Sequence, residues 1–248
     1  MLILLTIIFG LLIGSFLNVC IYRLPKNESI VTPPSHCTVC NTHLKPWDLI
    51  PVISYLLSRG RCRYCSTSFS PRYAFVELLT ASLFVWCFYV FELSPELIKA
   101  LILTSFFIVI TFIDYDHQLI LDKVLACLSI VGVVINLWTH SVEPFNMLIG
   151  SLLGGGLLLI IALVSGGGMG GGDIKFAAAL GLCFGWEYLI LTLFLSFIFG
   201  GIGGVLLLVF KMKSRKDFIP FGPFIALAAL FTLLYGNNMI TWYMEIIS

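Results

Sequence analysis

The sequence predicts an all-α polytopic membrane protein with about eight transmembrane helices and a small cytoplasmic lobe between the first two. Of its 248 residues, 59% are hydrophobic and only 11% are charged, whereas a soluble globular chain carries about 25% charged residues. Eight apolar runs follow one another, and crossing a bilayer takes about 20 apolar residues. A single sizeable polar segment interrupts them, and this segment is the predicted lobe.

The apolar runs set the predicted domain organisation. The first run opens without a basic residue and is followed by Arg23, so we interpret it as a retained helix and not as a cleaved signal peptide. The predicted parts are a first helix at 1–22, a lobe at 23–73 and a membrane-embedded domain at 74–248. The expected helices cover 2–22, 74–92, 97–114, 119–139, 145–165, 174–186, 188–210 and 220–244.

The positions of Lys and Arg predict the orientation in the cytoplasmic membrane, because basic residues concentrate in cytoplasmic loops. With the amino terminus outside and eight crossings, all 14 basic residues except Lys99 lie on the cytoplasmic side. The same orientation places four acids at the cytoplasmic face, although only Lys and Arg were used to choose it. These acids are Asp114, Asp116, Asp122 and Asp173. We therefore expect an active site at that face.

A glycine-rich stretch at 166–172 separates the fifth and sixth runs and ends on Asp173. Each glycine costs a helix about 1 kcal/mol relative to alanine, so we expect the stretch to be irregular. Irregular backbone at membrane depth is tolerated only where protein buries it or where it lines a water-filled cavity. The sequence therefore predicts that Asp173 faces a wet cavity. The Cβ-free backbone of Gly170, Gly171 and Gly172 could pair there with an unwound peptide.

A second group of acids, Asp114, Asp116 and Asp122, follows the third run. A solvated helix end would account for them, but acids at membrane depth are candidates for function. Two carboxylates that share a site hold one proton between them. One can then activate water while the other protonates a carbonyl or a leaving amine. Glu77, one turn inside the second run, could pair with Arg72 or line the same cavity.

Two Cys-x-x-Cys pairs lie in the polar lobe with 21 residues between them. This spacing is typical of a structural zinc site with four thiolates, and disulfides are rare in the reducing cytoplasm. A lobe this small and polar needs a stabilising cross-link such as a structural metal ion. The predicted zinc ligands are Cys37, Cys40, Cys62 and Cys65.

Four motifs in order resemble those of type IV prepilin peptidases. Gly170-Gly171-Gly172-Asp173 matches the GxGD motif of intramembrane aspartyl proteases. Residues 14–25 (GSFLNVCIYRLP), 112–118 (FIDYDHQ) and 220–224 (PFGPF) resemble the family's amino-terminal signature, first aspartate motif and closing segment. Leu121 departs from the family pattern, which usually has proline before the last acid.

The resemblance implies a membrane aspartyl endopeptidase that removes the leader from type IV prepilins or pseudopilins, cutting after a glycine. It implies that Asp114 and Asp173 are the catalytic pair, with Asp116 as the alternative first acid, and that Glu77 and Asp116 lie on the substrate side. In many members it also implies methylation of the new amino terminus with S-adenosylmethionine, although no methyltransferase motif is legible in 23–73. The lipid bilayer is the other expected partner, and no nucleic acid is expected.

Two other interpretations remain open. A transporter or channel could use the glycine-rich break as a half-site, with the zinc lobe as a regulator. However, the acids lie at one face, and the sequence has no visible duplicated half. A presenilin-like GxGD protease would need a proline-rich final motif, and only Pro220 and Pro223 resemble it. HExxH, P-loop and GxSxG motifs are absent from the sequence.

Overall fold

The structure is a computed structural model that describes residues 1–210 and 219–247. The predicted cytoplasmic cations Lys211, Lys213, Arg215 and Lys216 lie outside these residues. The chain divides into two compact units, Met1–Leu97 and Ile98–Ser248. Within the described residues, seven helices are long and apolar enough to cross a membrane, and the chain forms no strand beyond two isolated bridges. The predicted all-α, polytopic fold class is confirmed.

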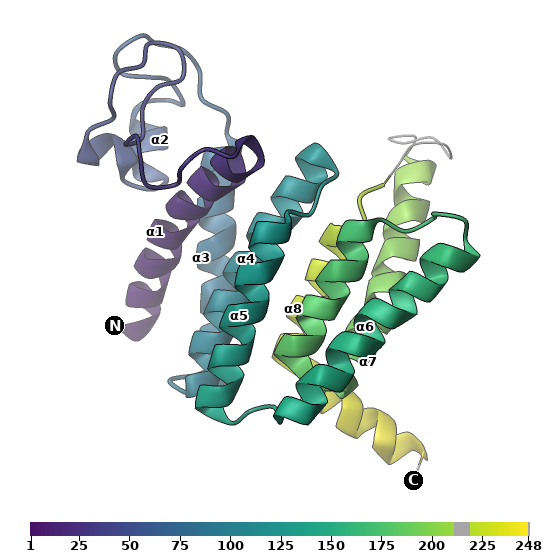
Figure 1. Ribbon diagram of the computed structural model, residues 1–248. Coiled ribbons are helices and arrows are strands. Elements are labelled where there is room, and N and C mark those ends of the chain that lie inside the picture. The colour runs from purple at the N-terminus through teal and green to yellow at the C-terminus, as the bar shows by residue number, and fades with distance from the viewer. Residues whose placement is uncertain (211–218, 248) are drawn as a thin grey trace. The chain divides into compact units, whose positions relative to one another are not determined.

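The first unit consists of two long helices and the polar lobe that connects them (Figure 1). Its elements are α1 (Leu2–Arg23), η1 (Leu24–Lys26), η2 (Pro46–Leu49), α2 (Ile53–Leu57) and α3 (Arg72–Phe91). The backbones of α1 and α3 come close at two glycines of α1. A Cβ at Gly10 would lie 2.6 Å from the Cα of Ala81, and one at Gly14 would lie 2.7 Å from the Cα of Glu77. Small residues permit this close packing of membrane helices.

The second unit is a bundle of long helices. It contains α4 (Pro95–His117) from Ile98 onward, α5 (Asp122–Thr139), α6 (Pro144–Val164), α7 (Gly171–Val209) and α8 (Gly222–Ile247). Glycines again set the closest packing, here between α6 and α7. A Cβ at Gly150 would lie 2.6 Å from the carbonyl oxygen of Gly181, and one at Gly154 would lie equally close to that of Ala177. The first part of α7, which begins beside Asp173, is therefore packed tightly against α6.

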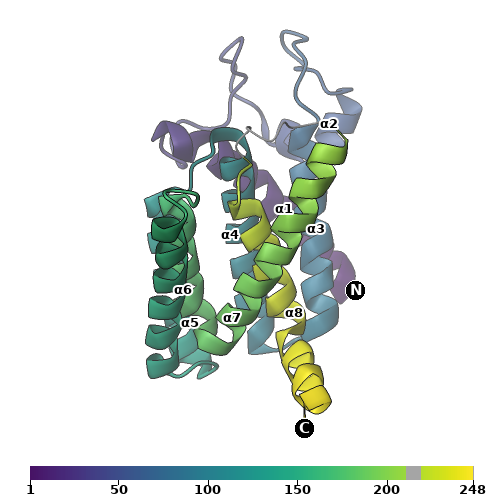
Figure 2. The ribbon, with the colours of Figure 1, turned by 90° about the vertical axis from the view of Figure 1, so that its right-hand side faces the viewer.

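The break predicted between helices at 174–186 and 188–210 is confirmed, although no loop separates the two helices. Both belong to the 39-residue α7, in which Gly185 alone is non-helical, with φ 75° and ψ 179°. A straight helix of that length would span about 58 Å, twice the hydrocarbon core of about 30 Å. The kink instead divides α7 into two arms, and the second arm runs back toward the end where α8 begins (Figure 2). There, Gly200 contacts the ring of Phe221.

A buried polar cluster holds the kink. The side-chain amide of Asn136 on α5 donates to the carbonyl oxygens of Leu182 and Cys183, both at 3.0 Å. These carbonyls end the first arm, where an α-helix leaves its last oxygens without partners. The ammonium of Lys99 donates to Asn136 Oδ1 at 2.6 Å. Lys99, the one cation that the sequence leaves on the outer side, thus belongs to the support of this kink.

The glycine-rich stretch is irregular only in part. Gly166 and Gly167 have φ of 64° and 95°, as expected for an irregular connection. The expectation fails for Gly171 and Gly172, which are the first two residues of α7. The first N–H groups of a helix have no intrahelical partner. An acid in the first turn and the packing of α7 against α6 offset the cost of glycine there.

Candidate active site

Asp114 lies in the last turn of α4 and is 5% exposed. Its Oδ2 accepts the backbone N–H of Gly222, the first residue of α8, at 3.0 Å. This N–H has no partner within α8, because it belongs to the helix start. A Cβ at Gly222 would lie 2.5 Å from the same carboxylate oxygen. Glycine at this position therefore allows the start of α8 to approach the acid.

Asp173 lies in the first turn of α7 and is 6% exposed. Its carboxylate accepts the backbone N–H of Gly170, the residue that caps the helix. It also interacts electrostatically with Asp114. A Cβ at Gly170 would lie 2.9 Å from Oδ2 of Asp173. The structure thus brings the predicted acids Asp114 and Asp173 together, each buried and each held by an N–H at a helix start.

Ile120 completes this arrangement, and sequence reasoning missed it. It lies in the connection between α4 and α5 and is 7% exposed. Its side chain fits between two glycines. A Cβ at Gly172 would lie 3.0 Å from Ile120 Cβ, and one at Gly222 would lie 3.2 Å from Ile120 Cδ1. Three of the four residues between α4 and α5, at 118–121, are apolar, so no sequence signal singled out Ile120.

The other two acids of the first group are exposed. Asp116 is exposed, whereas Asp114 is buried, which favours Asp114 as the partner of Asp173. Asp122, the first residue of α5, binds the ammonium of Lys175 at 2.8 and 2.9 Å. Their side chains are 69% and 59% exposed, and such surface pairs contribute about 0–1 kcal/mol. Leu121 caps α5 in an extended conformation, so the helix break occurs there without proline.

Glu77 belongs to the first unit and is buried. Its Oε2 accepts the backbone N–H of Val52 at 2.7 Å, and its carboxylate also bonds to the Ser15 side chain. Val52 has a φ of 61°, which costs a β-branched residue energy. Glu77 therefore holds a strained lobe residue against α1 and α3, a contact that the sequence did not indicate.

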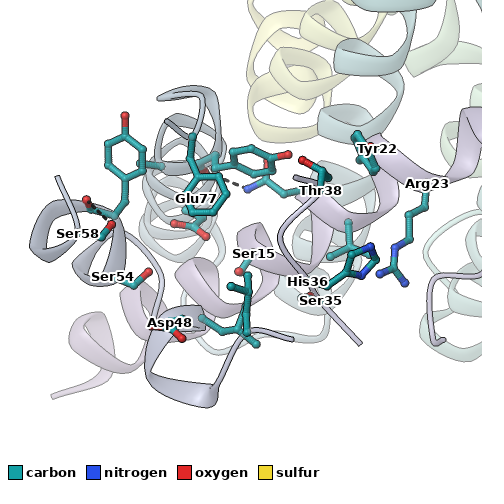
Figure 3. A pocket seen from close by; sticks show the side chains of 18 of the residues that line it. Ser15, Tyr22, Arg23, Ser35, His36, Thr38, Asp48, Ser54, Ser58 and Glu77 are labelled. Atoms are coloured by element: carbon teal, nitrogen blue, oxygen red, sulfur yellow. Dashed lines mark hydrogen bonds between the residues drawn. The ribbon is translucent and has the colours of Figure 1, made fainter. Parts of the chain in front are cut away.

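A pocket of about 580 Å³ lies within the first unit (Figure 3). Side chains from α1, the lobe and α3 line it, and they carry charges of both signs, hydroxyl groups and aromatic rings. Arg23 is fixed at its edge by a 2.9 Å bond from Nη1 to the carbonyl of Ser29. The charged and aromatic lining includes Arg23, Glu28, Asp48, Tyr55, Arg61, Arg63, Tyr64, Tyr73 and Glu77. Sequence reasoning did not predict this pocket.

The four lobe cysteines form one cluster. All four Sγ atoms lie within 4.8 Å of one another, and those of Cys37 and Cys65 are 3.8 Å apart. A tetrahedral zinc with Zn–S bonds of about 2.3 Å places its sulfurs about 3.8 Å apart. The cluster therefore fits a zinc ion with four thiolates and no position left for a substrate, as predicted for a structural site.

The two cysteine pairs sit on matching turns. The N–H of Cys37 donates to the carbonyl of Thr42 at 3.0 Å, and the N–H of Cys62 donates to that of Thr67 at 2.8 Å. Each turn also places a threonine hydroxyl 3.3 Å from the sulfur of its second cysteine. This contact lowers the pKa of the Cys65 thiol to about 6 and favours the thiolate, which is the metal-binding form.

Comparison with known proteins identifies both units. Residues 8–91 match the bacterial peptidase A24 N-terminal domain, and residues 101–205 match the type IV leader peptidase family. A prepilin leader peptidase/N-methyltransferase of Legionella pneumophila is 34% identical over 95% of this chain and 92% of its own. That of Pseudomonas aeruginosa is 34% identical over 97% and 92%, and that of Bacillus subtilis is 31% identical over 96% of both chains. No solved structure matches the chain.

Proposed function

Because this chain belongs to the type IV leader peptidase family, we propose that Asp114 and Asp173 cleave the leader from type IV prepilins or pseudopilins. The protein is a multi-pass membrane peptidase. The observation that carries the proposal is the pairing of these two buried acids, each bound by an N–H at a helix start. The Lys and Arg distribution favours the cytoplasmic face of the cytoplasmic membrane as the place of cleavage.

The proposed chemistry needs only the two carboxylates and a water. One carboxylate takes a proton from water while the other gives a proton to the scissile carbonyl oxygen, and a tetrahedral intermediate forms. Proton transfer to the amide nitrogen then breaks the C–N bond and releases the leader acid and the new amine. Burial beside glycine backbone strengthens the electrostatic interactions that position both acids. Gly170, Gly171 and Gly172 border Asp173, and we propose that the unwound peptide approaches over them.

The test replaces each acid by asparagine in purified full-length protein and measures prepilin cleavage in detergent. General acid–base catalysis contributes about 10²–10⁴-fold, so Asp114→Asn and Asp173→Asn should each lose at least that factor. Asp116→Asn tests the alternative first acid, and it should retain far more activity than Asp114→Asn because Asp116 is exposed. If Asp116→Asn loses prepilin cleavage while Asp114→Asn retains it, the catalytic role belongs to Asp116 instead of Asp114. If the wild-type protein cleaves no prepilin, the peptidase assignment fails and the transporter interpretation stands.

The pocket of the first unit supports a second function. The relatives are named as N-methyltransferases, and we propose that this pocket binds S-adenosylmethionine. When bound, that molecule supplies an electrophilic methyl group for the new amine. Arg61 would hold its carboxylate, Glu28 its cationic groups and the tyrosines its flat base, whereas Arg63 and Asp48 already pair with each other at 3.3 Å. The mixed charges of the lining fit such a zwitterion.

A binding measurement tests this assignment independently of cleavage. Arg61 lines the pocket, whereas Arg59 in the same lobe does not. A lost hydrogen bond to a charged group costs about 1.5–3 kcal/mol, so calorimetry should show Arg61→Ala binding S-adenosylmethionine at least about tenfold more weakly. Arg59→Ala should bind as wild type does, and both variants should retain their zinc. If Arg61→Ala and the wild type bind S-adenosylmethionine with equal affinity, this pocket is not the binding site of the methyl donor.

A further inference from the structure

We propose that Ile120 is a specificity-determining residue that limits the size of the substrate residue on the amino side of the cleaved bond. The proposal rests on the peptidase function assigned above and concerns the same site. It starts from the position of Ile120 between Gly172 and Gly222. Gly172 precedes Asp173, and the N–H of Gly222 binds Asp114, so Ile120 contacts the backbone beside each acid.

The space around the acids has little tolerance for added atoms. A Cβ at Gly170 would crowd Asp173, and a Cβ at Gly222 would crowd both Asp114 and Ile120. A scissile carbonyl must come within about 3.5 Å of the reacting groups. It therefore has to pass next to the side chain of Ile120. A substrate glycine adds no side chain to this space, whereas a substrate alanine adds a methyl group that Ile120 opposes.

Ile120 is also held firmly enough to act as a wall. Its β-branched side chain has little freedom at χ1, and the side chain is almost completely buried. The connection is fixed on both sides. The N–H of Gln118 donates to the carbonyl of Asp114 at 2.8 Å on one side, and the N–H groups of Val124 and Leu125 donate to the carbonyl of Leu121 at 3.0 and 3.1 Å on the other. A fixed wall discriminates by size, whereas a mobile one would move aside.

The experiment compares two prepilins that differ only in glycine or alanine before the cleaved bond. A single methyl group in a fitted pocket changes kcat/KM by about 10–200-fold, and the wild-type protein should prefer the glycine substrate by a factor in that range. Ile120→Ala should lower the glycine-to-alanine ratio at least about tenfold, since the smaller side chain makes room for the methyl group. Ile120→Val should give an intermediate ratio.

The matched control is Ile135→Ala, an equally buried isoleucine on α5, where the same atoms are removed away from the acids. It should lower stability without changing the ratio. If Ile120→Ala is inactive on both substrates, the ratio measured for Ile120→Val decides. An unchanged ratio in the active Ile120 variant would overturn the proposal and leave Ile120 a packing residue. A wild-type protein that cleaves neither substrate would instead refute the peptidase assignment itself.

Discussion

Replacing Gly222 by alanine should impair catalysis far more than folding. The added Cβ would lie 2.5 Å from Oδ2 of Asp114, whereas Cβ contacts under 3.0 Å essentially do not occur and 3.4 Å is ordinary. The carboxylate must therefore withdraw by about 0.5–0.9 Å, and a misplacement of about 1 Å can cost about 10²-fold in rate. We expect kcat for prepilin cleavage to fall by about that factor.

The accompanying change in stability should be small, because two effects oppose each other. Alanine favours a helix over glycine by up to about 1 kcal/mol, whereas a lost hydrogen bond to a charged group costs about 1.5–3 kcal/mol. The net loss of about 0.5–2 kcal/mol should leave the protein folded in the assay. Thermal unfolding of the same purified sample measures this.

Gly201→Ala is the matched control, because it makes the same change at an exposed position inside α7. A Cβ there meets nothing within 4 Å, so the cleavage rate should change by no more than about twofold. Wild-type cleavage by Gly222→Ala would refute the idea that this N–H positions Asp114. An equal loss in Gly201→Ala would refute the argument from contact distances.

Three further predictions concern stability and metal. Purified protein should contain about one zinc per chain, since a closed tetrahedral shell takes one ion, and Cys62→Ser should release it and destabilise the lobe; a zinc-free, stable wild type would contradict this. Asn136→Ala should lower the free energy of unfolding by about 1–3 kcal/mol, because the buried Lys99 and two α7 carbonyls lose a partner, and an unchanged melting temperature would count against the kink support. Gly166→Ala has free space but a φ of 64°, so it should cost about 1–2 kcal/mol with no change in kcat, and full stability would argue against strain at that turn.

The sequence alone determined the features that depend on local pattern. Hydropathy predicted the membrane helices, because each apolar run has to be long enough to cross a bilayer. The spacing of Cys37, Cys40, Cys62 and Cys65 predicted the metal cluster, because the ligands come from two short turns whose geometry is local. Motif order pointed to Asp114 and Asp173 and to the family. Each of these signals lies in a stretch of about a dozen residues or in a spacing that recurs along the chain.

Only the tertiary structure decided what depends on packing between distant segments. It distinguished Asp114 from Asp116 by burial, since two positions along α4 turn a side chain from the bundle interior to its surface. It joined Asp114 to the N–H of Gly222, which lies 108 positions away in the chain. It also placed Ile120 beside both acids and Lys99 at the kink of α7. No spacing encodes such contacts, because the helix crossings that create them are set by glycine and side-chain packing throughout the bundle.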